Sequence, residues 1–260
     1  SLYVHLPFCE ALCYYCGCNV QITKDRKRSA SYVDALLVEL GEVARLLGSR
    51  RKLSQVAWGG GSPTFSSVGE LEKLHLGTKA LFDITADAEV SIEIDPRVTS
   101  DAHLARLREM GFNRVSLGVQ DFDPRVQKAV HRVQSKEMTF SMLKKCRSLG
   151  YTGINLDLIY GLPYQTLDSF KNTIECVLEA RPDRIALYNY AHLPALRSNQ
   201  KILEKMQRPE ADLRLEIFVA AYVRLTNSGY LAIGMDHFAV KEDELSEALD
   251  TGNLYRNFQG

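Results

Sequence analysis

Strand-like and helical patterns alternate six times along this chain, and this alternation restricts its possible folds more than any other feature. Each short apolar or alternating stretch is followed by a longer one with apolar residues three and four positions apart. We expect strands at 2–6, 55–58, 89–95, 114–120, 153–160 and 184–190, and helices at 29–47, 71–81, 100–110, 135–149, 167–180 and 209–228. Successive strand–helix units predict parallel strands with right-handed crossovers, as in a β/α barrel or a doubly wound sheet.

The domain organisation follows from the same pattern. No G-x-G-x-x-G loop opens any of the helices, which disfavours a dinucleotide-binding doubly wound sheet. We therefore predict an α/β fold of the partial (β/α)6 barrel type, open on one side, with parallel strands and outer helices. A chain of 260 residues with 45% hydrophobic content can bury the core of such a domain. We place the barrel at 1–228 and the start of a C-terminal extension at 229–260.

The charge balance argues against two classes of partner. The chain has 32 lysines and arginines against 32 aspartates and glutamates, so it has no net field to attract nucleic acid. No apolar run approaches the roughly 18 residues that a membrane span requires, and no charged-then-apolar leader opens the chain. We expect a cytoplasmic protein without a membrane span.

Four of the six cysteines lie in one short stretch after the first expected strand. Cys9, Cys13 and Cys16 have the spacing C-x3-C-x2-C, which allows three thiolates to converge on one metal centre. If that centre is an iron–sulfur cluster with four irons, three thiolates leave one iron without a protein ligand, unless Cys18 supplies the fourth thiolate. A structural zinc site is the alternative, although no second cysteine pair or His-x3–5-His follows. Disulfides are disfavoured in a reduced compartment.

The expected strands carry polar residues on one face, whereas buried parallel strands are usually apolar on both. Glu93 and Asp157 belong to these polar faces, and a turn with three glycines, at 59–61, follows the second strand. Polar faces inside a barrel predict a binding cavity; the alternative is a layered core whose residues satisfy one another. The glycines permit a ligand to approach the backbone closely, and an ordinary tight turn rarely needs three of them.

Longer stretches resemble one family. The cysteine spacing resembles that of radical S-adenosylmethionine (SAM) enzymes, and a series of stretches from the first residue to the last resembles the oxygen-independent coproporphyrinogen III oxidase (dehydrogenase) family. The stretches are SLYVHLPFC, CYYCGCN, WGGGSPT, SIEIDPR, GFNRVSLGVQDF, NLDLIYGLP, YNYAHLP, IGMDHFA and YRNFQG. The resemblance implies that a short arm before the first strand and the rest of the family's C-terminal domain are absent from this chain.

The resemblance implies radical chemistry. Three cysteines would hold a [4Fe–4S] cluster in the loop at 9–18, and the cluster would pass one electron to SAM, giving a 5′-deoxyadenosyl radical. That radical would take hydrogen from the propionate side chains of coproporphyrinogen III. Loss of carbon dioxide and an electron, twice per substrate, would give protoporphyrinogen IX in porphyrin and haem biosynthesis. A reductant such as flavodoxin or ferredoxin and a monomeric state are expected.

The resemblance also assigns site residues position by position. Cys9, Cys13 and Cys16 are the expected cluster ligands, and Tyr3 and Cys18 the expected catalytic residues. Two SAM molecules are expected. Contacts to the first are Tyr3, Gly60, Glu93 and Arg132, and contacts to the second are Tyr15, Gly61, Ser62, Gln120, Asp157 and Ala191. The family usually has phenylalanine in place of Tyr15 and threonine in place of Ser62, and both changes keep the ring or the hydroxyl.

Two other readings stay open. A haem-binding chaperone relative shares the barrel and the three cysteines, but Cys18 and the stretch IGMDHFA favour the oxidase. Another radical SAM enzyme, defined by a part of the protein beyond this chain, is the third reading. Arg97 and Arg184, near strand ends, are candidates to bind the substrate's propionates, and His75 is expected on a helix surface.

Overall fold

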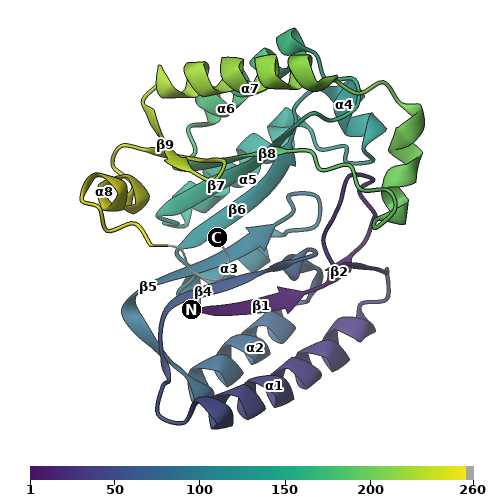
Figure 1. Ribbon diagram of the computed structural model, residues 1–260. Helices are drawn as coiled ribbons and strands as arrows, with labels where there is room; N and C mark the ends of the chain where they lie inside the picture. The colour runs from purple at the N-terminus through teal and green to yellow at the C-terminus, as the bar shows by residue number, and fades with distance from the viewer. Residues whose placement is uncertain (256–260) are drawn as a thin grey trace. The chain divides into compact units, whose positions relative to one another are not determined.

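The computed structural model describes residues 1–255, and its larger sheet has eight strands in the order β1-β4-β5-β6-β7-β8-β10-β9 (Figure 1). In this order β1 and β9 stand at the two ends, so the sheet is not closed. The strands are β1 (Leu2–Leu6), β4 (Lys52–Gly60), β5 (Asp83–Ile94), β6 (Arg114–Gln120), β7 (Gly153–Tyr160), β8 (Arg184–Asn189), β9 (Tyr230–Gly234) and β10 (His237–Val240). A second, two-stranded sheet pairs β2 (Phe8–Cys9) with β3 (Gln21–Ile22).

Helices connect the parallel strands. The α-helices are α1 (Lys27–Leu47), α2 (Val68–Leu81), α3 (Asp101–Glu109), α4 (Pro124–Ala129), α5 (Lys136–Ser148), α6 (Leu167–Ala180), α7 (Ala211–Thr226) and α8 (Glu244–Asp250). Two short 3-10 helices are η1 (Pro63–Phe65) and η2 (Ser198–Lys205). Within residues 1–255, none of the helices combines the length and the apolar character needed to cross a bilayer. The prediction of parallel strands with outer helices is confirmed.

Two compact units share this sheet. The first comprises Ser1–Ala11, Cys18–Ser116 and Lys145–Thr152, and the second comprises Leu12–Gly17, Leu117–Lys144 and the chain from Gly153 onward. The cysteine loop therefore contributes residues to both units.

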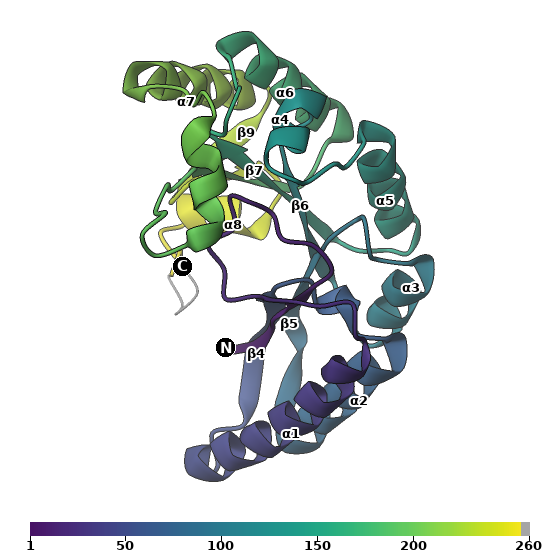
Figure 2. The ribbon, with the colours of Figure 1, turned by 90° about the vertical axis from the view of Figure 1, so that its right-hand side faces the viewer.

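The first unit contains the parallel strands β1, β4 and β5, with α1 and α2 side by side next to β4 and β5 (Figure 2). Helix α1 forms because its apolar residues recur at helical spacing, and Val33, Leu36, Leu40 and Ala44 are buried as that spacing predicts. Helix α2 begins with a capping box, in which Ser67 and Glu70 satisfy each other's backbone N–H groups. The ring of Trp58 meets that of Phe112 edge-on, with centroids 4.8 Å apart, in the core of this unit.

The second unit contains the parallel pair β7 and β8, onto which the antiparallel hairpin β9–β10 adds through β10. Helices α6 and α7 lie side by side in both views. The expected domain boundary at 228 falls between α7 and β9, and β10 continues the sheet of β8 past that boundary. The last part of the expected extension, 256–260, lies outside the described residues, as does most of the stretch YRNFQG. The domain boundary stays a prediction.

The alternation expected along the strands is present in the structure. In β5 the apolar residues Val90, Ile92 and Ile94 are buried, whereas Glu93 is exposed. In β7 Leu156 and Leu158 are buried, and Asp157 between them is half-buried. The apolar faces supply the core, and the polar faces carry the candidate site residues.

Candidate functional site

The base of the cysteine loop is held by the short β2–β3 pair in the first unit. The backbone N–H of Gln21 donates to the Pro7 carbonyl at 2.8 Å, and that of Thr23 donates to the Cys9 carbonyl at 3.0 Å. The half-buried Cys9 lies with its Sγ 3.9 Å from Ser62 Oγ. These contacts bring the two ends of the loop together and place Cys9 beside the turn that follows β4.

The part of the loop that carries Cys13 and Cys16 belongs to the second unit. A tight turn joins the two cysteines, because the Cys16 N–H donates to the Cys13 carbonyl at 3.1 Å. The Tyr14 N–H donates to the Val130 carbonyl at 3.0 Å, and the Tyr14 ring stacks on His131 with centroids 5.0 Å apart. Cys13 is buried and Cys16 half-buried. The backbone between the two thiols is thus held in place at Tyr14.

Glycines at the end of β4 are required by close neighbours in the first unit. A Cβ on Gly59 would lie 2.6 Å from Glu93 Oε1, and one on Gly60 would lie 2.6 Å from the His5 ring. Gly60 has a φ of +115°, which side-chain-bearing residues rarely adopt, and its N–H donates to Glu93 Oε2 at 3.2 Å. Gly61 would meet the Pro7 backbone at 2.7 Å. The turn therefore brings its backbone against the Glu93 carboxylate.

Tyr3 and His5 lie on β1 beside this turn. His5 Nε2 donates to the Asn19 carbonyl at 2.8 Å, so its Nδ1 accepts from the Tyr3 hydroxyl at 3.1 Å. Burial raises the pKa of Tyr3 to about 12, and the nearby Glu93 and Cys18 add to the effect. The Tyr3 hydroxyl consequently keeps its proton at neutral pH, and His5 links β1 to the cysteine loop.

In the second unit, Arg132 lies beside the Cys13 thiol. Its guanidinium donates from Nη2 to the Gly118 carbonyl at 2.6 Å, and Nη1 lies 3.8 Å from Cys13 Sγ. A Cβ on Gly118 would come within 2.8 Å of Gln120 Nε2 and 2.9 Å of Arg132 Nη2. Gln120 ends β6 with a φ of +69°. The glycine in β6 thus makes room for both the arginine and the glutamine.

Asp157 and Ala191 belong to the same unit. Asp157 Oδ1 accepts a hydrogen bond from Asn155 Nδ2 at 2.7 Å. The Ala191 carbonyl accepts from Gln200 Nε2 at 3.1 Å, and the same amide bonds the Tyr15 carbonyl at 2.9 Å. Tyr15 and Ala191 are therefore joined through one side chain.

The expected site residues divide between the two units. The first contains Cys9 with Tyr3, Gly60, Gly61, Ser62 and Glu93, whereas the second contains Cys13 and Cys16 with Tyr15, Gln120, Arg132, Asp157 and Ala191. Cys18 is exposed and belongs to the first unit. Among residues 1–255 no three His, Cys, Asp or Glu side chains form a preassembled metal site. The assignments of ligands and contacts stay predictions.

Two expectations about other residues are wrong. Arg184 is the first residue of β8, as the expected strand at 184–190 has it, and its Nε lies 2.9 Å from Asp243 Oδ1 while Nη2 lies 2.9 Å from Glu244 Oε1. Its charge is thus already matched by two carboxylates, which removes the case for a propionate ligand there. His75 is buried against the Phe112 ring, not exposed on its helix. Arg97 pairs with Asp95, with Nη2 and Oδ2 2.6 Å apart.

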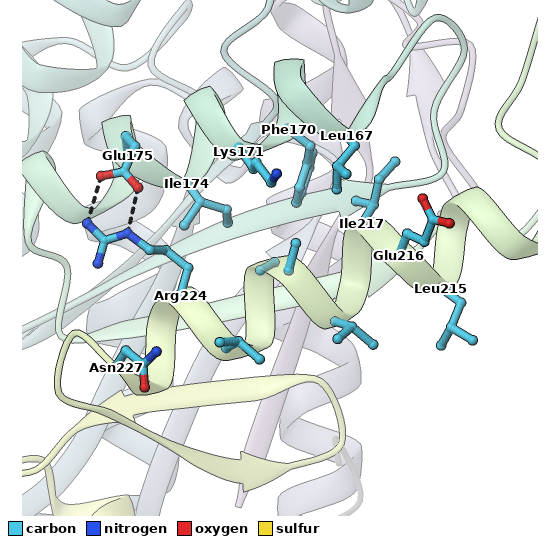
Figure 3. Close-up of a pocket in the computed structure, with 14 residues that line it drawn as sticks. Leu167, Phe170, Lys171, Ile174, Glu175, Leu215, Glu216, Ile217, Arg224 and Asn227 are labelled. Atoms are coloured by element: carbon cyan, nitrogen blue, oxygen red, sulfur yellow. Dashed lines mark hydrogen bonds and ion pairs between the residues drawn. The ribbon is translucent and has the colours of Figure 1, made fainter.

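A pocket of about 750 Å³ lies between α6 and α7 in the second unit (Figure 3). Its lining is largely apolar, with Phe170 and Ile174 from α6 facing Ile217 from α7. Glu175 and Arg224 bridge the two helices at one end, at 2.6 and 2.8 Å. None of the groups expected to bind a cofactor contributes to this pocket.

Two residues that the sequence did not single out contact the cysteine loop of the second unit, and a third is buried next to Gln120 in the chain. Asn199 and Gln200, in η2, bond the carbonyls of the cysteine loop, and Asp121 is buried directly after Gln120. Asn199 and Gln200 follow the loop by more than 180 positions, so no local spacing connects them with it. Asp121 lies within the stretch GFNRVSLGVQDF, which supports the family resemblance. Nothing in the sequence, however, indicates that a carboxylate at the end of a strand is buried.

Parallel strands with outer helices, and an N-terminal strand that leads into a C-x3-C-x2-C loop, make this an α/β protein with three closely spaced thiols at the end of its first strand. Three thiols with this spacing suit such a cluster chemically. The family model of the radical SAM superfamily matches residues 3–177. The chain belongs to the radical SAM superfamily, and membership implies a [4Fe–4S] cluster and SAM as cofactors.

Relatives of high sequence identity share one name. The proteins named oxygen-independent coproporphyrinogen III oxidase from Salmonella typhimurium and Pseudomonas aeruginosa are 46% and 48% identical over all of this chain. The solved structure of coproporphyrinogen III oxidase (HemN) from Escherichia coli, described as a radical SAM enzyme, matches with a TM-score of 0.96 and 46% identity, over 100% of this chain and 60% of that one. This chain spans 57% of the length of the two curated relatives.

Proposed function

We propose that this chain is the radical SAM part of an oxygen-independent coproporphyrinogen III oxidase. The whole enzyme would convert two propionate side chains of coproporphyrinogen III into vinyl groups and release protoporphyrinogen IX, in porphyrin and haem biosynthesis. The observation that carries the proposal is identity of 46–48% to enzymes of that name along the full length of this chain. The C-x3-C-x2-C loop and the Tyr3–Glu93 surroundings support it.

Cys9, Cys13 and Cys16 would hold the [4Fe–4S] cluster. When bound, the cluster supplies the electron that cleaves SAM and so begins the oxidation of the propionates. Arg132 supports this assignment, because its guanidinium lies 3.8 Å from Cys13 Sγ and offsets the negative charge of a thiolate centre. The protein's own task is to position the reactants and to exclude water from them.

Two SAM molecules would bind near the loop. For the first we propose Tyr3, Gly60, Glu93 and Arg132. The Tyr3 hydroxyl donates its one hydrogen to His5 Nδ1, so toward SAM its oxygen can accept a hydrogen bond, while the Glu93 carboxylate suits hydroxyl or ammonium donors. For the second we propose Tyr15, Gly61, Ser62, Gln120, Asp157 and Ala191. Tyr3 and Cys18 are the proposed catalytic residues, and their electrostatic coupling supports a shared location.

The remaining parts of the proposal concern the whole protein. The barrel would comprise residues 1–228, with a C-terminal extension beginning in 229–260. Flavodoxin or ferredoxin is the proposed class of reductant, and we propose a monomer in the cytoplasm. A tetrapyrrole with several carboxylates requires basic groups in the complete enzyme, and Arg97 stays a candidate.

The test is anaerobic incubation of the full-length protein with coproporphyrinogen III, SAM and a reductant. We expect protoporphyrinogen IX, measured by the fluorescence of protoporphyrin after oxidation. Cys13→Ala should abolish the product. Cys146→Ala is the matched control, because this thiol is fully buried in the first unit outside the loop, and it should keep the activity. Product formation by Cys13→Ala at the wild-type rate would refute the proposal.

A further inference from the structure

The part of the cysteine loop in the second unit directs its backbone carbonyls toward the side-chain amides of η2. Asn199 Nδ2 donates to the carbonyl of Cys16 at 3.0 Å and to that of Tyr14 at 3.1 Å, and it lies 3.4 Å from that of Cys13. Gln200 Nε2 donates to the Tyr15 carbonyl at 2.9 Å. Four consecutive carbonyls outside any helix or strand thus lie within hydrogen-bond distance of two adjacent side-chain amides, and the Cys13 carbonyl also accepts from the Cys16 N–H.

The two amides are themselves fixed. Gln200 is 2% exposed, its Oε1 accepts from the Leu193 N–H at 2.6 Å, and its Nε2 also donates to the Ala191 carbonyl at 3.1 Å. Leu203 on the same 3-10 helix lies in a buried apolar cluster against which the rings of Tyr14 and Tyr15 pack. The loop and η2 therefore contact each other through both polar and apolar groups.

We propose that Asn199 and Gln200 are positioning residues for the cluster loop. By bonding the carbonyls of residues 13–16, they hold the backbone between Cys13 and Cys16 in the shape in which both thiolates can ligate the cluster. Gln200 also joins this backbone to Ala191, so that the loop and a proposed SAM contact keep a common geometry. The inference rests on the proposed function, because it concerns the ligands of that cluster. Neither amide touches the reacting atoms.

A carboxylate at position 199 tests the donors while keeping the size of the side chain. Asn199→Asp replaces the donating amide with a carboxylate oxygen, which accepts hydrogen bonds only. The hydrogen bonds to the loop carbonyls are lost, and the contact with these three oxygens becomes repulsive. Changing groups that orient metal ligands typically costs about 10–100-fold in metal affinity or activity. Asn199 is only half-buried, so the variant should fold, whereas Gln200 is a riskier site because of its burial.

Asn113 offers a matched control in the first unit. Its Nδ2 donates to the Ala88 carbonyl at 2.8 Å and its Oδ1 accepts from the Val90 N–H at 2.9 Å. It thus bonds backbone groups of β5, as Asn199 bonds those of the cysteine loop. Asn113→Asp removes equivalent donors without touching that loop.

The experiment uses anaerobically reconstituted wild type, Asn199→Asp and Asn113→Asp. The readouts are the rate of iron release to a ferrous chelator, the electron paramagnetic resonance spectrum of the reduced cluster, and thermal unfolding. We expect iron release from Asn199→Asp to be about tenfold faster or more, with a changed spectrum, while Asn113→Asp keeps the wild-type rate and spectrum. As a second arm, Gln200→Met should weaken SAM binding to the reconstituted protein more than Asn199→Asp does.

Iron release and spectrum of Asn199→Asp that match a cluster-loaded wild type would overturn the positioning role and leave the proposed function intact. Equal acceleration in Asn113→Asp would also overturn it, because the effect would then reflect general destabilisation. A wild type that assembles no cluster at all would instead refute the proposed function, and the positioning role with it.

Discussion

Asp121 should make the stability of this protein fall as the pH rises through the mildly acidic range. The side chain is 1% exposed and follows Gln120 at the end of β6. Burial raises its pKa from 3.8 to about 6, although hydrogen bonds from the Asp123 N–H, Thr173 and Gln165 act in the opposite direction. Thr173 Oγ1 donates to Oδ1 at 2.7 Å and Gln165 Nε2 to Oδ2 at 2.5 Å. The carboxyl thus connects β6 with α6 and with the turn after β7.

The sign and size follow from the two pKa values. Because the folded-state pKa of Asp121 lies above the unfolded one, this group binds more protons in the folded protein between pH 4 and 6, and its contribution to stability declines as the pH rises. Between pH 4.5 and 7.5 the unfolding free energy contributed by Asp121 falls by about 2 kcal/mol. The slope is about 1.4 kcal/mol per pH unit while the group is protonated in the folded state and ionised in the unfolded state. Asp121→Asn removes this titration. The mismatch of its amide with one hydrogen-bond donor shifts stability by an amount that does not depend on pH.

The assay is urea unfolding of the apoprotein at pH 4.5, 6.0 and 7.5, followed by circular dichroism. The difference in unfolding free energy between wild type and Asp121→Asn should change by about 2 kcal/mol across this range, in favour of the variant at high pH. Asp250→Asn, at an exposed position, alters the net charge equally and should keep the wild-type pH dependence. A difference between wild type and Asp121→Asn that stays constant with pH would refute the reasoning.

Three further changes test the site and the packing. Glu93→Gln keeps the size of the side chain but removes the charge beside the Gly60 N–H, so SAM should bind about ten- to a hundredfold more weakly. Equilibrium dialysis measures the affinity, and the circular dichroism spectrum should not change. Unchanged affinity would count against the predicted contact. Phe112→Ala empties a fully buried site next to Trp58 and should cost about 3–5 kcal/mol in urea unfolding, and a loss below 1 kcal/mol would contradict the packing. Ser67→Ala removes the capping box of α2 and should cost about 1 kcal/mol, whereas no loss would mean that the cap contributes nothing.

The sequence predicted the regular part of the fold because burial there follows simple periods. The strands expected at 2–6, 114–120 and 153–160 and the helix at 167–180 match β1, β6, β7 and α6. The short helix α4 was missed, since six residues give too few turns for a helical period. The hairpin β9–β10 was also missed. Its turn has positive φ at Met235 and Asp236, and methionine is not typical of such a turn position.

The site was predictable where its residues are close in sequence or carry unusual chemistry. The cysteine spacing and the glycine turn are of this kind, and both lie where the structure shows tight backbone constraints. Asn199 and Gln200 could not be found in this way, because an amide that bonds a carbonyl far away in the chain resembles any surface amide. The pairing of Arg184 with Asp243 escaped prediction for the same reason, since the partners are 59 positions apart.

The proposed function requires a [4Fe–4S] cluster held by Cys9, Cys13 and Cys16 with one iron available to SAM. The most direct measurement is iron analysis with Mössbauer and electron paramagnetic resonance spectroscopy of anaerobically reconstituted protein, before and after SAM is added. We predict about four irons per chain, as in one cubane cluster, and a spectrum that changes when SAM binds. Zinc in place of iron, or a cluster ligated at all four irons by the protein and unchanged by SAM, would contradict the account.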